Sequence, residues 1–217
     1  MKGAAMRQGK FLVFEGVEGC GKTTQAKLLA DRLHDASYDV LLTKEPGGDS
    51  GICKKIREIL LDPAYKDEMV LRTELLLFEA DRAQHADGVI RPALEAGKIV
   101  ICDRYEAATF AYQCGARQIC TPNFYLSVNR FATERLNPDF TFWVDLDPAV
   151  GLERNVAAHK RDRFEMERVE FHRAVRQGYA DYFEKIAPPG KWKKFDGTLS
   201  ITELHKEIAD TIVAMNP

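Results

Sequence analysis

One segment near the start of the chain, FLVFEGVEGCGKTT at Phe11–Thr24, constrains the fold more than any other. Its first four residues, Phe11–Phe14, are apolar and long enough for a buried strand. The next residues, Gly16–Thr23, fit the pattern G-x-x-x-x-G-K-[ST]. Apolar residues then recur at helical spacing over Thr24–Leu33. The segment therefore predicts a strand, a glycine-rich loop and a helix, which together begin an α/β fold.

This loop has the composition of a site for an oligophosphate. Glycines let the backbone curve so that several N–H groups point inward, and the helix adds its positive N-terminal end. We expect Lys22 to reach the β- and γ-phosphates of a nucleoside triphosphate and the Thr23 hydroxyl to ligate Mg²⁺. The predicted ATP-binding residues are Gly16, Val17, Glu18, Gly19, Cys20, Gly21, Lys22, Thr23 and Thr24.

Strands and helices alternate along the rest of the chain. Four further strands are expected at Tyr38–Thr43, Lys98–Cys102, Phe140–Val144 and Lys191–Phe195. Helices are expected at Ile52–Leu61, Thr73–Leu94 with a kink or break at Pro92, Ala107–Cys114, Phe124–Ala132, Val150–Ala157, Phe164–Lys185 and Ile201–Met215. This order predicts a five-stranded parallel sheet covered by helices on both faces. The length of 217 residues fits one domain, with residues 1–10 as a flexible start.

The composition excludes several classes of protein. A formal net charge of −2 gives no reason to expect a nucleic-acid-binding or membrane-binding surface. No apolar run has the length of a membrane span, and the start of the chain lacks the apolar part of a secretory signal. The five cysteines show no zinc-site spacing, so we expect reduced thiols in a cytoplasmic protein. Cys20 lies close to Lys22, which predicts either a lowered pKa and sensitivity to oxidation, or simply a small residue that fills the loop.

Polar residues follow the other predicted strands. Asp103 ends the apolar run IVICD, a pattern that phosphate-loop enzymes use to hold Mg²⁺ through water, so Thr23 and Asp103 are the candidate metal residues. The Lys44–Gly48 loop, KEPGG, lies at the carboxyl end of the second strand, where ligands of open α/β sheets bind. The charged run His159–Arg163 interrupts two helices and predicts a mobile lid over about 154–165.

Together, five motifs resemble the thymidylate kinase family. They read FEGVEGCGKTTQ, KEPGG, LLLFEADRAQH, DRYEAATFAYQ and FWVDLDPAVGLERN, and the likeness runs from Phe11 to the last helix. The resemblance implies a nucleoside monophosphate kinase-like three-layer fold with a small lid. It also implies Mg²⁺-dependent transfer of the γ-phosphoryl group of ATP to dTMP, giving dTDP for dTTP biosynthesis, and a homodimer.

The resemblance assigns roles to residues by matched position. Arg57 and Arg104 match arginines that contact phosphate, Phe78 an aromatic that stacks on thymine, and Arg82 a residue that hydrogen-bonds the base. Tyr112 matches an aromatic that crowds the 2′ position of the sugar. The substrate-binding residues implied are Glu18, Glu45, Pro46, Arg57, Phe78, Arg82, Arg104, Thr109, Tyr112 and Gln113. The catalytic residues implied are Lys22, Arg104, Arg154, Arg161 and Arg163.

The chain departs from the family pattern at several positions. Lys44 replaces an arginine before E-P-G-G, and Ala108 replaces a serine that is common after D-R-Y. Gly19 occupies the place at which one branch of the family carries a catalytic arginine, so the chain resembles the branch whose lid supplies that cation. The cation is then one of Arg154, Lys160, Arg161 and Arg163, of which Arg154 and Arg163 align best.

Two other readings of the sequence stay open at this stage. One is a different phosphate-loop kinase acting on AMP, GMP, CMP or a nucleoside, against which the E-P-G-G and A-Y-Q motifs argue. The other is a nucleotide-binding regulator without turnover; a switch GTPase would show an N-K-x-D-type segment, which the sequence lacks. A phosphorylation assay over a panel of monophosphates distinguishes the three.

Overall fold

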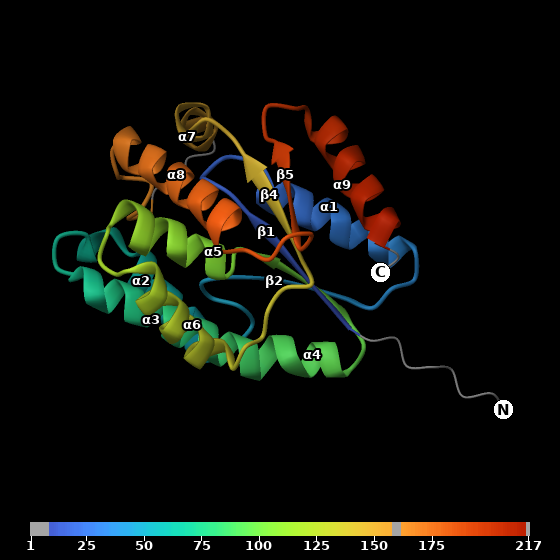
Figure 1. The fold of residues 1–217 in the computed structure, drawn as a ribbon, viewed down its shortest axis with the longest axis horizontal. Coiled ribbons are helices and arrows are strands. Elements are labelled where there is room, and N and C mark those ends of the chain that lie inside the picture. Colours follow the sequence, from blue (N-terminus) through green and yellow to red (C-terminus); the bar gives the residue numbers. More distant parts are fainter. Residues whose placement is uncertain (1–8, 158–161, 216–217) are drawn as a thin grey trace.

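A five-stranded parallel sheet forms the centre of the molecule, as the sequence predicts. The computed structural model describes residues 9–157 and 162–215. The strands are β1 (Lys10–Glu15), β2 (Val40–Lys44), β3 (Ile99–Asp103), β4 (Phe140–Asp145) and β5 (Trp192–Asp196). They lie in the order β2-β3-β1-β4-β5 (Figure 1), so the strands that follow β1 lie on both sides of it. Ligands of such sheets bind at the carboxyl ends of the strands around this central position.

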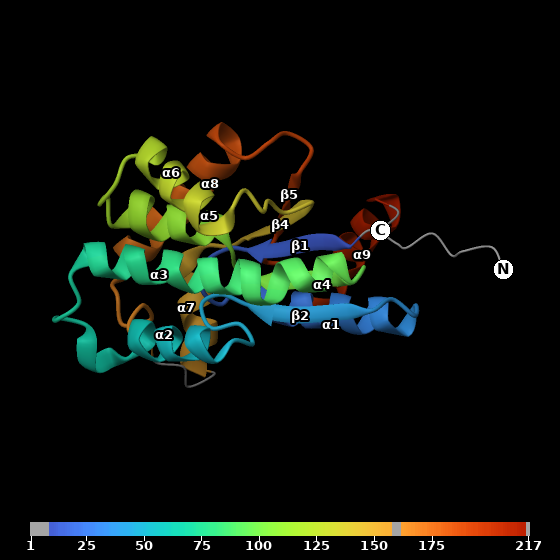
Figure 2. The same cartoon turned by 90° about the horizontal axis from the view of Figure 1, so that it is seen from below.

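Helices cover both faces of the sheet. They are α1 (Lys22–Asp35), α2 (Gly51–Leu61), α3 (Leu71–His85), α4 (Arg91–Glu95), α5 (Glu106–Thr109), α6 (Pro122–Thr133), α7 (Pro148–Ala157), α8 (Val169–Lys185) and α9 (Ile201–Met215). Two π-helical segments, η2 (Ala86–Ile90) and η3 (Phe110–Ala116), and the 3₁₀ turn η1 (Pro63–Tyr65) complete the set. Figure 2 shows α5, α6 and α8 on one side of the sheet and α1 on the other. No helix in the described ranges is both long enough and apolar enough to pass through a bilayer.

Strand β1 is buried on both faces, which explains its unbroken apolar sequence. Leu12 and Phe14 belong to the core that contains α1, whereas Phe11 and Val13 pack with Ile90 of η2 and its neighbours. A parallel strand covered on both faces requires apolar side chains at every position, not only at alternate ones. The strand signal in the sequence was strong for this reason.

The long helix predicted for Thr73–Leu94 is interrupted earlier than expected. Helix α3 ends at His85, and the π-helical turn Ala86–Ile90 precedes Pro92 in the first turn of α4. Proline lacks an N–H group, and in a regular helix its ring would clash with the carbonyl four residues earlier, that of Gly88. The wider turn places the irregularity before the proline, with no sharp break at it.

The helix predicted for Phe164–Lys185 begins at Val169, so its first turn was predicted wrongly. The Asp162 carboxylate accepts hydrogen bonds from the backbone N–H groups of Phe164 (2.9 Å) and Glu165 (3.0 Å), which closes a turn there. Short acidic side chains compete in this way with helical hydrogen bonding. The turn places Phe164 at the wall of the cavity described below.

Close backbone contact joins η3 to α8. A Cβ atom on Gly178 would lie 2.8 Å from the Cα atom of Ala111, and one on Gly115 would lie 2.9 Å from the Cα atom of Gly178. Contacts this short exclude any side chain at either glycine. The approach brings Tyr179 of α8 and Tyr112 of η3 to the same arginine, Arg104.

Candidate active site

A cavity of about 1000 Å³ opens at the carboxyl ends of β1, β2 and β3. The phosphate loop, the loop after β2, α3, η3, α7 and the segment before α9 all contribute to its wall. The predicted site residues that line it are Glu18, Gly19, Cys20, Gly21, Lys22, Thr23, Thr24, Glu45, Pro46, Arg57, Phe78, Arg82, Asp103, Arg104, Thr109, Tyr112, Gln113 and Arg154. The structure therefore brings most of the predicted residues to one space.

The phosphate loop is held against α7. Gly19 has a φ of +68°, and a Cβ atom there would lie 2.0 Å from the carbonyl oxygen of Gly151. No arginine fits at this position, which is the physical reason that any catalytic cation must come from elsewhere. The Lys22 ammonium donates to the Val17 carbonyl (3.2 Å), across the loop. Within the described residues no side chain caps the start of α1, so its first N–H groups are left for an anion.

The candidate metal residues meet beside the loop. The Thr23 hydroxyl donates to Asp103 Oδ2, and the parallel register that pairs Phe14 with Asp103 brings the two elements together. The other carboxylate oxygen, Oδ1, is buried and has no hydrogen-bond partner within residues 9–157 and 162–215. A hydroxyl beside a carboxylate oxygen that lacks a donor suits Mg²⁺, which takes few protein ligands and completes its shell with phosphate and water. The residues present thus fit the metal.

Cys20 differs from expectation. Its side chain is buried, and burial raises the pKa of its thiol above the ordinary value although Lys22 and Arg104 act in the opposite direction. The expectation of a lowered pKa is therefore wrong, because burial outweighs the effect of Lys22. The structure favours the alternative, a small residue that fills the loop, since a Cβ on Gly16 would lie 2.8 Å from the Cys20 sulfur.

Arg104 connects the phosphate loop to η3. Its guanidinium donates to the Gly16 carbonyl (2.9 Å) and to Glu18 Oε1 (2.8 Å), and the Tyr112 hydroxyl also donates to Glu18 Oε1 (2.8 Å). Burial alone would raise the pKa of Glu18, but Arg104, Lys22 and the tyrosine hydrogen bond outweigh it and lower that pKa to about 2. Glu18 is an anion fixed between the loop and the tyrosine ring at all ordinary pH values.

Glu15 lies beneath this cluster and was not among the predicted site residues. It accepts hydrogen bonds from the backbone N–H of Tyr105 (2.8 Å) and the Tyr179 hydroxyl (3.0 Å), and that hydroxyl accepts from Arg104 (2.7 Å). Complete burial raises the pKa of Glu15 to about 7, against the lowering effect of Arg104. A glutamate at the end of an apolar strand was a usable signal for this position, whereas Tyr179 on a long helix gave none.

Three aromatic rings form one wall of the cavity. The centroid of Phe164 lies 5.9 Å from that of Phe78 and 5.6 Å from that of Tyr112. The distances are those of ordinary aromatic packing. Phe164 thus packs against both of the other rings. Phe164 was not predicted as a site residue because it lies in a segment predicted to be helical.

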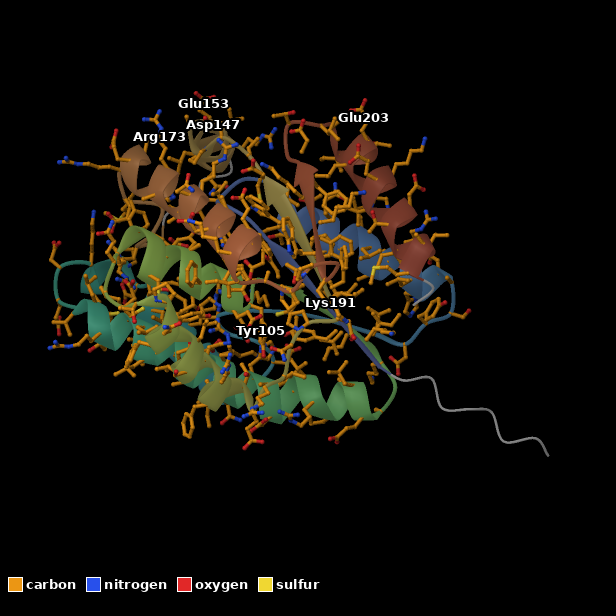
Figure 3. The ribbon with its side chains drawn as sticks, in the orientation of Figure 1. Tyr105, Asp147, Glu153, Arg173, Lys191 and Glu203 are labelled. Carbon is orange, nitrogen blue, oxygen red and sulfur yellow. The ribbon has the colours of Figure 1, made fainter. Side chains whose placement is uncertain are left out.

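Arg82 uses every donor of its guanidinium inside the protein. Its N–H groups donate to Glu45 Oε2 (3.0 Å), Glu79 Oε1 (2.8 Å), Asn129 Oδ1 (3.3 Å), the Tyr105 carbonyl (3.0 Å) and Thr109 Oγ1 (2.8 Å). Figure 3 shows Tyr105 in the interior, between sheet and helices. A guanidinium has five N–H groups, so a hydrogen bond from Arg82 to a base requires one of these bonds to be shared or exchanged.

The loop after β2 is fixed by α2 and α3. Arg57 donates to the Pro46 carbonyl (2.5 Å), and burial lowers the pKa of its guanidinium. In addition to its contact with Arg82, Glu45 is hydrogen-bonded to His85 Nδ1 (2.9 Å). The other ring nitrogen, His85 Nε2, is hydrogen-bonded to the Thr43 hydroxyl (2.8 Å). Hydrogen bonds at both ring nitrogens therefore give His85 a structural role.

The candidate lid cations have different environments. Arg154 lines the cavity and donates to the carbonyls of Gly19 (3.3 Å) and Gly197 (3.1 Å). Arg163 does not line the cavity; it is buried and donates to Glu74 Oε2 (2.6 Å) and the Leu60 carbonyl (3.0 Å). Arg161 and Lys160 lie outside the described residues. Arg154 is therefore the candidate whose guanidinium the structure places beside the phosphate loop.

The cavity also extends to a segment that the sequence analysis did not select. Gly197, Thr198, Leu199, Ser200 and Ile201 line it beside Gln25, whose amide donates to the Ile201 carbonyl (2.9 Å). The Asp196–Gly197 turn follows β5, so the position at a strand end was the available signal.

Comparisons with known proteins give one consistent result. The sequence model of the family described as Thymidylate kinase matches residues 14–208. The thymidylate kinase of Pelobacter propionicus is 43% identical over 212 residues, which cover 95% of this chain and 93% of that protein. The thymidylate kinase of Trichormus variabilis is 42% identical (94% and 95% covered), and that of Acholeplasma laidlawii is 43% identical (94% and 98% covered).

Proposed function

This chain belongs to the thymidylate kinase family, and we propose that the residues of its cavity transfer the γ-phosphoryl group of ATP to the 5′-phosphate of dTMP, giving dTDP. The family uses ATP as phosphoryl donor together with Mg²⁺. The observation that carries the assignment of roles is that one cavity contains both a phosphate loop and a separate aromatic wall with its own arginines.

The donor end would hold the triphosphate. The N–H groups at the start of α1 and the Lys22 ammonium face the loop, and Thr23 with Asp103 would hold Mg²⁺, which neutralises charge on the β- and γ-phosphates when bound. Residues Gly197–Ile201 would border the rest of the nucleotide.

The acceptor end would hold dTMP between Phe78 and Tyr112. Arg57 and Arg104 line this part of the cavity and can each contact a phosphate oxygen. Tyr112 is held by Glu18, so its ring cannot withdraw easily from the 2′ position of a sugar. Glu45 and Pro46 complete the border of this subsite.

The reaction brings two anionic groups together, and the protein must offset their repulsion. At ~4 Å and an effective dielectric constant of ~20, each pair of unit charges repels by about 4 kcal/mol. The acceptor is a phosphate oxygen that is already anionic, so it needs positioning and neutralisation more than a general base. We assign these tasks to Lys22, Arg57, Arg104 and Arg154.

We propose that the whole chain acts as one domain and that a lid over about 154–165 closes on the phosphates. Arg154 is the cation we place on the transferring group, and Arg161 stays a second candidate. Closure would exclude water, which otherwise accepts the phosphoryl group.

A coupled assay over a panel of monophosphates tests the proposal. With ATP and Mg²⁺ we expect the highest kcat/KM for dTMP, followed by dUMP, and little turnover of CMP, AMP or GMP. Lys22→Ala serves as the control for contaminating kinase activity. Higher kcat/KM for AMP or GMP, or ATP binding without turnover, would contradict the assignment.

We also propose a cytoplasmic homodimer. Apolar side chains are exposed on the neighbouring helices α3 and α6: Leu76 is 59% exposed and Phe131 86% (Figure 1). Exposed apolar side chains on two helices that contact each other suit a contact between two copies of the chain. In analytical ultracentrifugation, the Leu76→Glu and Phe131→Glu variants should each sediment as a monomer. If both variants still sediment as dimers, the contact between the two copies lies elsewhere.

A further inference from the structure

We infer that Glu74 is a positioning residue that fixes the side-chain amide of Gln113, so that the acceptor site takes a pyrimidine with a donor at N3. The inference rests on the proposed function, because it concerns the base of the acceptor nucleotide. Neither the sequence motifs nor the roles described above give Glu74 a task.

Glu74 is a buried carboxylate at the first turn of α3. Its side chain is fully buried and holds three donors from other elements: Arg163 Nη1 at 2.6 Å, Gln113 Nε2 at 2.8 Å and Arg117 Nε at 3.4 Å. A guanidinium can only donate, and one faces each carboxylate oxygen: Arg117 Nε lies at Oε1 and Arg163 Nη1 at Oε2. The carboxylate is therefore an acceptor in all of its contacts.

This contact decides which way the Gln113 amide points. Oε1 of Glu74 already accepts from Arg117, so the group of Gln113 that faces the same oxygen is a donor, the NH₂ and not the carbonyl. Gln113 lines the cavity, and its Oε1 atom is buried and has no partner within residues 9–157 and 162–215.

A free carbonyl at this wall selects among pyrimidines. Thymine and uracil carry a donor at N3, whereas cytosine carries an acceptor there, so cytosine would place two acceptors against each other. Thr109 supports the same choice: its oxygen accepts from Arg82 (2.8 Å), which leaves its hydroxyl hydrogen to donate to a carbonyl at C4, where cytosine has an amino group.

Glu74 also connects this amide to the segment that follows the charged run. Arg163 precedes Phe164 in the chain and is held by Glu74, while Phe164 contacts Phe78 and Tyr112. One carboxylate thus fixes the hydrogen-bonding edge and one ring of the base site. Sites built to hydrogen-bond a specific edge discriminate strongly, because the wrong base leaves buried polar groups unpaired.

The test is the selectivity of Glu74→Gln. An amide at position 74 can offer its NH₂ to Gln113 and its oxygen to Arg163, so Gln113 can turn over and present its own NH₂ to the base. We expect the ratio of kcat/KM for dTMP to kcat/KM for dCMP to fall on the order of 10- to 100-fold relative to the unmodified enzyme.

Two variants separate this effect from a loss of packing. Glu74→Asp keeps an acceptor-only group and should retain the ratio within about threefold, at lower thermal stability. Arg117→Gln removes another partner of the same carboxylate and should also keep the ratio. A folded, active Glu74→Gln enzyme with the unmodified ratio would overturn the inference, and so would equal losses in Glu74→Asp. If the unmodified enzyme itself fails to phosphorylate dTMP, the proposed function is what has failed.

A measurement on the unmodified enzyme covers the case in which Glu74→Gln does not fold. dTMP labelled with ¹⁵N at N3 should give a slowly exchanging imino proton signal in the saturated complex, because N3–H donates to Gln113 Oε1. The signal should disappear in Gln113→Leu. Its absence in the unmodified complex, or its persistence in Gln113→Leu, would show that this carbonyl does not face the base.

Discussion

Replacing Glu15 by glutamine should change how stability depends on pH. Glu15 is completely buried, and its pKa rises from 4.5 to about 7 on folding. Its protonated form is therefore favoured in the folded state. Its contribution to stability is fully present below pH 4.5 and is lost as the pH rises through about 7. Glutamine resembles the protonated acid and does not titrate, so the variant lacks this loss.

The size of the effect follows from the two pKa values. The pKa of Glu15 shifts from 4.5 to about 7 on folding. Because of this shift, the free energy of unfolding of the unmodified protein should fall by about 2 kcal/mol more than that of the variant between pH 5.5 and pH 8.5. Glu79 and Asp81 also have raised pKa values, about 7 and about 6, but they are present in both proteins and cancel in the difference.

Urea unfolding at several pH values, without nucleotides, measures this difference. The free energy of unfolding of Glu15→Gln minus that of the unmodified protein should rise by about 2 kcal/mol from pH 5.5 to pH 8.5. Glu203→Gln, on the exposed surface near the start of α9 (Figure 3), is the control and should give a nearly constant difference. Two parallel curves for Glu15→Gln would refute the reasoning, because they would mean that Glu15 is already ionised at pH 5.5 in the folded protein.

Three further variants test the site. Lys22→Ala should lower kcat by orders of magnitude with little change in thermal stability, since it removes the cation beside the phosphates; near-normal kcat in the purified variant would contradict this role. Asp103→Asn should raise the Mg²⁺ concentration needed for half-maximal rate by roughly 10- to 100-fold, and an unchanged Mg²⁺ titration would exclude it as a metal residue. Arg163→Met should cost about 3–5 kcal/mol of unfolding free energy, since it leaves Glu74 partly uncompensated; a loss below about 0.5 kcal/mol in urea unfolding would mean the pair is not formed.

Much of the fold was predictable from the sequence because the decisive signals are local. The apolar run before the glycine-rich loop predicted β1, and the polar residues after β1, β2 and β3 predicted where the cavity lies. Parallel strands bring their carboxyl ends to one edge, so residues distant in the chain could be placed together without further information.

The remaining features depend on contacts between distant segments. Arg163 belongs to a charged run, which usually indicates a solvated surface. Its burial depends on Glu74, which lies 89 residues earlier in the chain. The raised pKa of Cys20 likewise follows from burial in the folded loop and not from its neighbour Lys22. No local pattern reports such pairings, since they exist only once the helices have packed.

The register between β1 and β3 has a consequence for how such an enzyme can change. It holds Asp103 at the end of β3 beside the phosphate loop that follows β1, so the proposed triphosphate site is built on adjacent strands of the central sheet. The proposed base site is built instead from α3, η3 and the turn after residue 161, which meet through side chains such as Glu74 and Gln113. Substitutions in those side chains should therefore change which nucleotide is accepted without changing the proposed ATP site. Helices α3 and η3 are thus the elements to redesign for a new acceptor.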